Sequence, residues 1–391
     1  MKITSLETLS ADAGWRTFSF VKLVTDTGIT GWSEYNESFG SHGLTDIINK
    51  LAPLVIGQDP RPYQRLVSML HVYTRQSQGG VTHQAIAAIE NALLDTKAKD
   101  LGIPVYALFG GPVRERIPLY WSHTGTYRAR NAEIMGVPPL LSYDDLARHG
   151  EDIVKQGFRA MKTNIIPSAD GRLVPFNPGF GRTPGWPALN WDESMLQAAR
   201  DTLAALRAGA GNQVGLMLDI NFHFKTDGFL RVAEAIAPYN LTWLELDTFD
   251  APSLAHIRSR APCSIASCET LCARRDFRPF FDAYAMDVAI IDVPWNGLAE
   301  AVKIAAMADA HEINVAPHNF YGHLCTMQSA HFCASVPNFH TMEIDIDGVP
   351  WRDEFYSAPP VIERGELIMP TGAGWGIEVN EAAVRARPPR T

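Results

Sequence analysis

Three short stretches of sequence decide the fold: Gly-Leu-Met-Leu-Asp at 215–219, Leu-Thr-Trp-Leu-Glu at 241–245 and Ser-Ile-Ala-Ser-Cys-Glu at 264–269. Each is a mainly apolar run of strand length that ends on an acidic residue. The acids Asp219, Glu245 and Glu269 are 26 and 24 residues apart, about the length of one strand–helix unit. Because parallel strands of a barrel end at the same rim, we expect these carboxylates to converge.

The same pattern continues in both directions along the chain. Apolar runs separated by helical patterns lie at 119–121, Ala160–Thr163, Gly215–Asp219, 241–245, 264–269, Val288–Asp292, 313–318 and 341–344. Eight such runs predict an α/β fold with a closed, TIM-like (β/α)7β barrel. The long interval between Lys162 and Asp219 predicts a loop after the second strand, on the face where substrate binds.

Residues 1–115 show a different pattern. Strand-like alternation at 18–25 resumes at 29–32 after Asp26-Thr27-Gly28, which predicts a β-hairpin. Helical periodicity follows at 44–54, 60–72 and 82–101. We therefore expect an α+β domain before the barrel.

Composition restricts the classes of function. The chain has 391 residues, a net charge of −9 and no long run of Lys or Arg, so nucleic acid is not an expected partner. No apolar run approaches the roughly 20 residues that span a bilayer. Met1-Lys2-Ile3 opens directly into strand-like sequence, so we expect a cytoplasmic protein with no membrane contact. The five Cys lack paired spacing, which predicts reduced thiols. Separately, we expect the protein to be a homo-oligomer.

Three clustered carboxylates repel one another unless a cation compensates their charge. An oxygen-only ligand set of high charge suits a hard divalent ion, so Asp219, Glu245 and Glu269 predict a Mg²⁺ site. The alternative is that each acid is a solvated loop residue. Three acids at matching strand ends favour the metal site.

A possible acid–base pair follows on the next strands. Asp292 and His318 end adjacent predicted strands, so the carboxylate can orient the imidazole and raise its basicity. Glu343 occupies the matching place on the last strand. His223 follows Asp219 closely enough to enter the same rim. Four other histidines lack a carboxylate at a matching strand end, namely His123, His311, His323 and His331.

Scattered motifs carry a family resemblance. Residues 85–95 (Ala-Ile-Ala-Ala-Ile-Glu-Asn-Ala-Leu-Leu-Asp), 102–106 and 108–111 are similar to the junction between capping domain and barrel in the enolase superfamily, mandelate racemase subgroup. Residues 372–377 (Gly-Ala-Gly-Trp-Gly-Ile) resemble its carboxy-terminal glycine motif. The resemblance implies a capping domain of residues 1–115, completed by a tail at 356–391, over a barrel of residues 116–355.

The resemblance also implies roles for individual residues. Asp219, Glu245 and Glu269 would be magnesium ligands, Asp292 and His318 the catalytic dyad, Lys162 a cation that binds the substrate carboxylate, and Glu343 an acid that hydrogen-bonds a substrate oxygen. Asn164 stands where the subgroup has a second lysine that serves its racemases as a base, and an amide cannot take that proton. Asp247 and Cys268 are two smaller departures, in place of Pro and Gly.

With one evident base, dehydration fits better than inversion. The leading hypothesis is an acid-sugar dehydratase that converts an aldonic or aldaric acid to a 2-keto-3-deoxy acid. The alternatives are a racemase, epimerase or cycloisomerase of the same superfamily, and a catalytically silent binding barrel. Candidates for substrate binding are Trp15, Arg16, Asn164, Asn221, His223 and the loop at 37–42.

Overall fold

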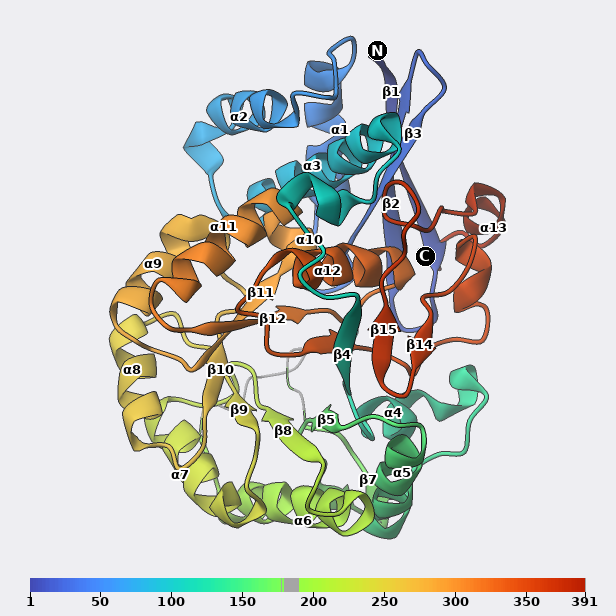
Figure 1. The fold of residues 1–391 in the computed structure, drawn as a ribbon. Helices are drawn as coiled ribbons and strands as arrows, with labels where there is room; N and C mark the ends of the chain where they lie inside the picture. The colour runs from blue at the N-terminus through green and yellow to red at the C-terminus, as the bar shows by residue number, and fades with distance from the viewer. Residues whose placement is uncertain (177, 179–189, 391) are drawn as a thin grey trace.

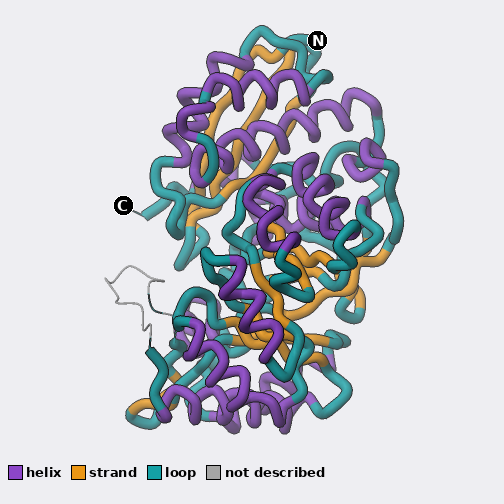
Figure 2. Tube along the Cα trace, turned by 90° about the vertical axis from the view of Figure 1, so that its left-hand side faces the viewer, coloured by secondary structure: helices purple, strands orange, loops and turns teal. Residues whose placement is uncertain are grey.

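The computed structural model describes residues 1–176, 178 and 190–390. An antiparallel sheet with helices stands above a barrel of parallel strands, and the tail runs alongside both (Figure 1). Figure 2 shows the same stacking from the side. Within the described residues no helix is long and apolar enough to cross a membrane.

The N-terminal sheet has the order β1-β2-β3, with β1 at Ile3–Asp12, β2 at Thr17–Thr25 and β3 at Thr30–Tyr35. Its β2–β3 hairpin confirms the predicted turn, in which Gly28 has a φ of 83° that favours glycine. The helices are α1 (Leu44–Val55), α2 (Tyr63–Tyr73) and α3 (Gly80–Leu101). A short 3-10 turn at Arg75–Ser77 separates α2 from α3, and another at Val105–Phe109 follows α3. They lie close to the three predicted helical segments.

The parallel barrel confirms the predicted fold class. Its strands are β4 (Arg116–Trp121), β5 (Ala160–Thr163), β8 (Gly215–Asp219), β9 (Trp243–Glu245), β10 (Ile265–Ser267), β11 (Val288–Asp292), β12 (Asn314–His318) and β13 (Met342–Ile344). They pair in sequence order from β4 to β12, and β13 pairs with β4. A bridge between Val315 and Phe339 completes the circle.

Helices cover the outside of the barrel. They are α4 (Thr126–Met135), α5 (Tyr143–Lys155), α6 (Glu193–Ala210), α7 (Thr226–Ile236) with a 3-10 turn at Ala237–Tyr239, α8 (Ala251–Arg260), α9 (Ala273–Asp282), α10 (Val293–Asn296), α11 (Leu298–Asp309) and α12 (His323–Ser335). The predicted loop after β5 contains the short strands β6 (Ser168–Ala169) and β7 (Arg172–Leu173). Residues 177 and 179–189 of that loop lie outside the described residues.

The tail contains a 3-10 turn (Arg352–Phe355), β14 (Ile362–Glu363), β15 (Glu366–Ile368) and α13 (Glu381–Ala386). Strand β15 pairs antiparallel with β4 at the edge of the barrel. Further on, the buried Trp375 donates its indole N–H to the carbonyl of Trp32 at 2.8 Å, and Lys22 pairs with Glu381 at 2.6 Å. The tail therefore contacts the N-terminal sheet, while the exact domain limits stay a prediction.

Packing explains why the strand ends carry function. Apolar side chains fill the barrel interior, among them Met217, Trp243, Ile290 and Ala316. Successive strand residues point to opposite faces, so the residue two positions later points to the same side. Those later residues are Asp219, Glu245, Asp292 and His318. Each therefore continues the interior row of its strand at the open end of the barrel.

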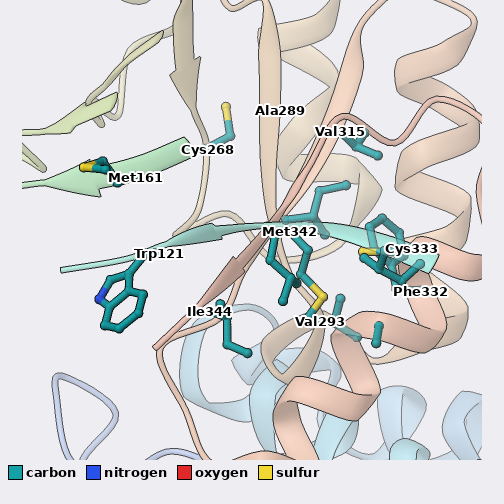
Figure 3. Close-up of a cluster of buried hydrophobic side chains, with 14 of the residues drawn as sticks. Trp121, Met161, Cys268, Ala289, Val293, Val315, Phe332, Cys333, Met342 and Ile344 are labelled. Atoms are coloured by element: carbon teal, nitrogen blue, oxygen red, sulfur yellow. The ribbon is translucent and has the colours of Figure 1, made fainter. Parts of the chain in front are cut away.

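A second layer of packing lies outside the strands. Figure 3 shows side chains from several strands and helices, such as Trp121 and Met161 on neighbouring strands and Phe332 on α12. The two layers hold the strand ends in place from inside and outside. This packing fixes the positions of the side chains at the rim.

Candidate active site

Three carboxylates meet at the open end of the barrel. Asp219 ends β8, Glu245 ends β9, and Glu269 lies two residues past β10. Each offers an oxygen atom within 4.8 Å of the other two. Burial raises the pKa of Glu245 to about 7 and that of Glu269 well above its usual range. Their ionised forms need a nearby positive charge, as expected for groups that bind a cation.

Lys162 on β5 supplies one such charge. Its Nζ lies 2.8 Å from Glu245, 2.9 Å from Glu343 and 3.7 Å from Asp219. Burial opposes the charge on this lysine, but the surrounding carboxylates raise its pKa well above the usual value. Lys162 is therefore a fixed cation beside the three acids.

His318 and Asp292 form the expected pair on adjacent strands. His318 Nδ1 lies 2.7 Å from Asp292 Oδ2, and its Nε2 lies 3.6 Å from Glu269. Trp295 donates its backbone N–H to Asp292 Oδ1 at 2.7 Å, and the Tyr321 hydroxyl donates to Oδ2. Burial alone would lower the pKa of His318, but Glu269 and Asp292 raise it to about 10.

Glu343 lies on β13, between β12 and β4. It accepts hydrogen bonds from the Ser122 hydroxyl and, at 2.8 Å, from the backbone N–H of Asn319. Burial opposes its ionisation, yet Lys162 and His318 lower its pKa to about 2. Glu343 is therefore an ionised acceptor.

A cavity of about 310 Å³ opens onto this rim. Six of the candidates line it, namely Trp15, Asp219, Asn221, Glu269, His318 and Glu343. Phe39, from the expected loop at 37–42, lines it too, so the N-terminal domain and the barrel share the site. A larger hollow of about 510 Å³ lies near Leu241, but its charged lining residues, Arg258 and Asp287, are paired with each other at 2.7 Å. We therefore assign function to the smaller cavity.

Three candidates for substrate binding have other contacts. The buried Arg16 pairs with Asp345 at 2.9 Å and donates to the carbonyl of Phe320. Asn164 accepts from the Thr126 hydroxyl at 2.9 Å and donates to the carbonyl of Asp219 at 3.1 Å. His223 packs edge-on against Phe176, and burial lowers its pKa to about 4. None of the three is among the residues that line the cavity.

Sequence reasoning missed several residues of this site. Asp247 accepts from the Ser267 hydroxyl at 2.9 Å and from the backbone N–H of Cys268 at 2.7 Å. The strand pattern predicts no partner for His123, but the Nδ1 atom of His123 lies 2.8 Å from Asp345 Oδ1. Asp247, Asp345 and His123 each lie one or two residues past a strand. Extending the strand-end rule by two positions would have found them.

Comparisons with known proteins agree with this geometry. Residues 5–110 match the mandelate racemase / muconate lactonizing enzyme N-terminal domain, and residues 145–383 match the enolase C-terminal domain-like family. The chain belongs to the mandelate racemase / muconate lactonizing enzyme family of the enolase superfamily. It is an enzyme of that superfamily.

Several relatives bear names of specific activities. The chain is 25% identical to a D-gluconate dehydratase of Thermoproteus tenax, with 96% of this chain and 72% of that protein covered. It is 27% identical to a D-galactonate dehydratase of Ralstonia nicotianae, with 99% and 94% covered. A Burkholderia xenovorans protein whose name suggests an L-alanine-DL-glutamate epimerase has been solved with magnesium and fumarate; it is 48% identical, with a TM-score of 0.97 and 100% and 97% coverage.

Proposed function

We propose that this chain is a magnesium-dependent dehydratase of an acid sugar, an aldonic or aldaric acid that it converts to a 2-keto-3-deoxy acid. The observation that carries the proposal is the shared rim of one cavity, where three clustered carboxylates lie beside Lys162 and the His318–Asp292 pair. Relatives named as dehydratases of gluconate and galactonate support the substrate class.

The three carboxylates fit a hard divalent cation. They offer oxygen atoms only, within 4.8 Å of one another, and burial disfavours ionisation of Glu245 and Glu269 without added positive charge. A bound magnesium ion would supply Lewis-acid stabilisation of the charge that develops on the substrate carboxylate.

The proton beside a carboxylate is a very weak acid, so the site has to stabilise the charge left behind. Lys162 places a buried ammonium group at the rim, where it can bind a carboxylate oxygen of the substrate. His318 presents Nε2 to the cavity, while Asp292 holds Nδ1 and fixes the orientation of the ring. We assign removal of the C2 proton to neutral His318, a form that a cation bound at Glu269 would favour, because the charge of Glu269 raises the pKa of this imidazole.

Dehydration is favoured over inversion because, among the described residues, an amide stands at the position of the second base. Asn164 occupies the position of a second base in racemases, and its amide is hydrogen-bonded to Thr126 and Asp219. An epimerase is the second candidate function, since the relative at 48% identity bears an epimerase name.

A screen of aldonic and aldaric acids tests the proposal. We expect the enzyme with magnesium to form a keto acid from at least one of them and to lose activity in excess chelator. Glu245→Gln should abolish turnover and weaken magnesium binding in calorimetry without unfolding the protein, whereas Glu234→Gln, an exposed change on α7, should do neither. Full activity in excess chelator would contradict the metal assignment.

A further inference from the structure

We propose that His123, oriented by Asp345, is the general acid that protonates the departing 3-hydroxyl. This inference rests on the proposed dehydratase function and adds a second proton-transfer group to it. Its basis is a second Asp–His pair at the same cavity.

The chain places His123 in an unusual backbone conformation. It lies two residues past β4 with a φ of 50°, in the left-handed region that non-glycine residues rarely adopt. Such strain persists where the surrounding structure fixes the residue, and it is concentrated at functional sites. Here the strained residue lines the cavity that holds Glu269, His318 and Glu343.

The contacts of the His123 ring define its orientation. Its Nδ1 lies 2.8 Å from Asp345 Oδ1 and 3.2 Å from the Ser122 hydroxyl. The ring stacks on that of Tyr127, with the two centroids 4.3 Å apart and an interplanar angle of 14°. Asp345 is buried and paired with Arg16, so it stays in place as an ionised acceptor for Nδ1–H. Nε2 is then the ring nitrogen available for proton transfer to a ligand.

The two imidazoles belong to one site. His318 and His123 both contact the ring of Phe320, with centroids 5.0 and 6.5 Å away, and both line the cavity. In each pair a buried aspartate holds Nδ1. Elimination needs a proton removed from C2 and a proton delivered to the oxygen on C3, which two separate imidazoles can supply.

Each proton and electron pair has a donor and an acceptor in this elimination. His318 takes the C2 proton, and the electron pair of that bond is held as the enolate of the substrate carboxylate. That pair then forms the C2–C3 double bond as the C3–O bond breaks. His123 gives its Nε2 proton to the departing oxygen, which leaves as water. The resulting enol then gains a proton at C3 from His318 and loses its 2-hydroxyl proton, which restores His123 through solvent.

The test compares His123→Asn with His318→Asn, using the acid that the wild-type enzyme dehydrates among D-gluconate, D-xylonate and D-galactonate. In deuterated water His123→Asn should dehydrate about 10²–10⁴-fold more slowly, the usual contribution of general acid–base catalysis. It should still exchange the C2 proton, so deuterium accumulates in the recovered acid. His318→Asn should lose both reactions.

A 3-deoxy-3-fluoro analogue separates catalysis from a structural role. Fluoride leaves with less need for a proton, so His123→Asn should eliminate fluoride at close to the wild-type rate, and His318→Asn should not. Equal losses with both leaving groups, or unchanged dehydration by His123→Asn, would overturn the inference and leave the proposed function intact. If His123→Asn fails to fold by circular dichroism, His123→Gln gives the same comparison. A wild-type enzyme that dehydrates none of the screened aldonic and aldaric acids would instead contradict the proposed function, and this inference with it.

Discussion

Asn164 lies beside the clustered acids, and its contacts can be named. Its side chain joins the hydroxyl of Thr126 to the carbonyl of Asp219, so it links α4 to the strand that carries one of the clustered acids. The amide supports the rim and has no role as a base. This position therefore contributes to structure in this chain.

Replacing Asn164 and His318 should have very different effects. We expect His318→Asn to slow turnover by at least 10²–10⁴-fold, because it removes the group assigned to the C2 proton. Asn164→Ala removes two hydrogen bonds and should slow turnover much less, with a lower free energy of unfolding by about 1–3 kcal/mol. Steady-state kinetics and urea unfolding measure the two effects. An Asn164→Ala enzyme as inactive as His318→Asn would contradict this assignment.

The site residues that end barrel strands could be predicted from the spacing of the strands in the sequence. Asp219, Glu245, Asp292 and His318 each end a strand, so spacing alone located them. His123 could not be located in this way, because its position depends on a left-handed backbone and on a partner 222 residues away. The pairing of Arg16 with the buried Asp345 could not be predicted either, because the two residues are far apart in sequence.

At the scale of elements, a carboxylate from the N-terminal sheet caps a barrel helix. Glu34 on β3 accepts hydrogen bonds from the backbone N–H groups of Gly322, Leu324 and Cys325 at 2.7, 3.1 and 3.2 Å. The first N–H groups of a helix lack partners within it, and the helix dipole favours an anion there. Glu34 therefore anchors the start of α12 to the capping sheet.

Removing this cap should destabilise the protein. Glu34→Ala leaves buried N–H groups at the start of α12 without their acceptor, and we expect the free energy of unfolding to fall by about 1–3 kcal/mol. Glu34→Gln keeps one acceptor oxygen and should cost less. Chemical denaturation of both variants checks the order, and an Ala variant as stable as the wild type would show that the cap contributes nothing.

The elements themselves were predictable from periodicity and turn residues, apart from their ends and the loop after β5. That loop was expected from its length and its glycines and prolines, but its composition does not define a conformation. The contact between Glu34 and α12 could not be predicted from the sequence either, because it joins residues 288 or more apart.

At the scale of the whole molecule, His331 connects three parts of the chain. Its Nδ1 accepts from the backbone N–H of Tyr106 at 3.0 Å, and its Nε2 lies 3.2 Å from the carbonyl of Trp375 in the tail. Burial lowers the pKa of this histidine to about 3, so the folded protein holds it neutral.

This histidine should make the fold sensitive to acid. The unfolded chain binds a proton at His331 below about pH 6.5 and the folded chain does not, so stability falls as pH drops from about 6.5 towards 3. We expect a loss of about 2 kcal/mol from this residue at pH 5. His331→Asn should weaken the pH dependence of unfolding between pH 7 and 5, whereas the exposed His256→Asn should not. Identical pH profiles for all three proteins would contradict this origin.

The most direct test of the central claim is nuclear magnetic resonance of the reaction in deuterated water. The enzyme is incubated with magnesium and the acid sugar that it consumes. Our account predicts a 2-keto-3-deoxy acid, little deuterium in the recovered starting material and no C2 epimer, because the opposite position holds Asn164. Rapid formation of the epimer without loss of water would contradict it and assign the enzyme as an epimerase.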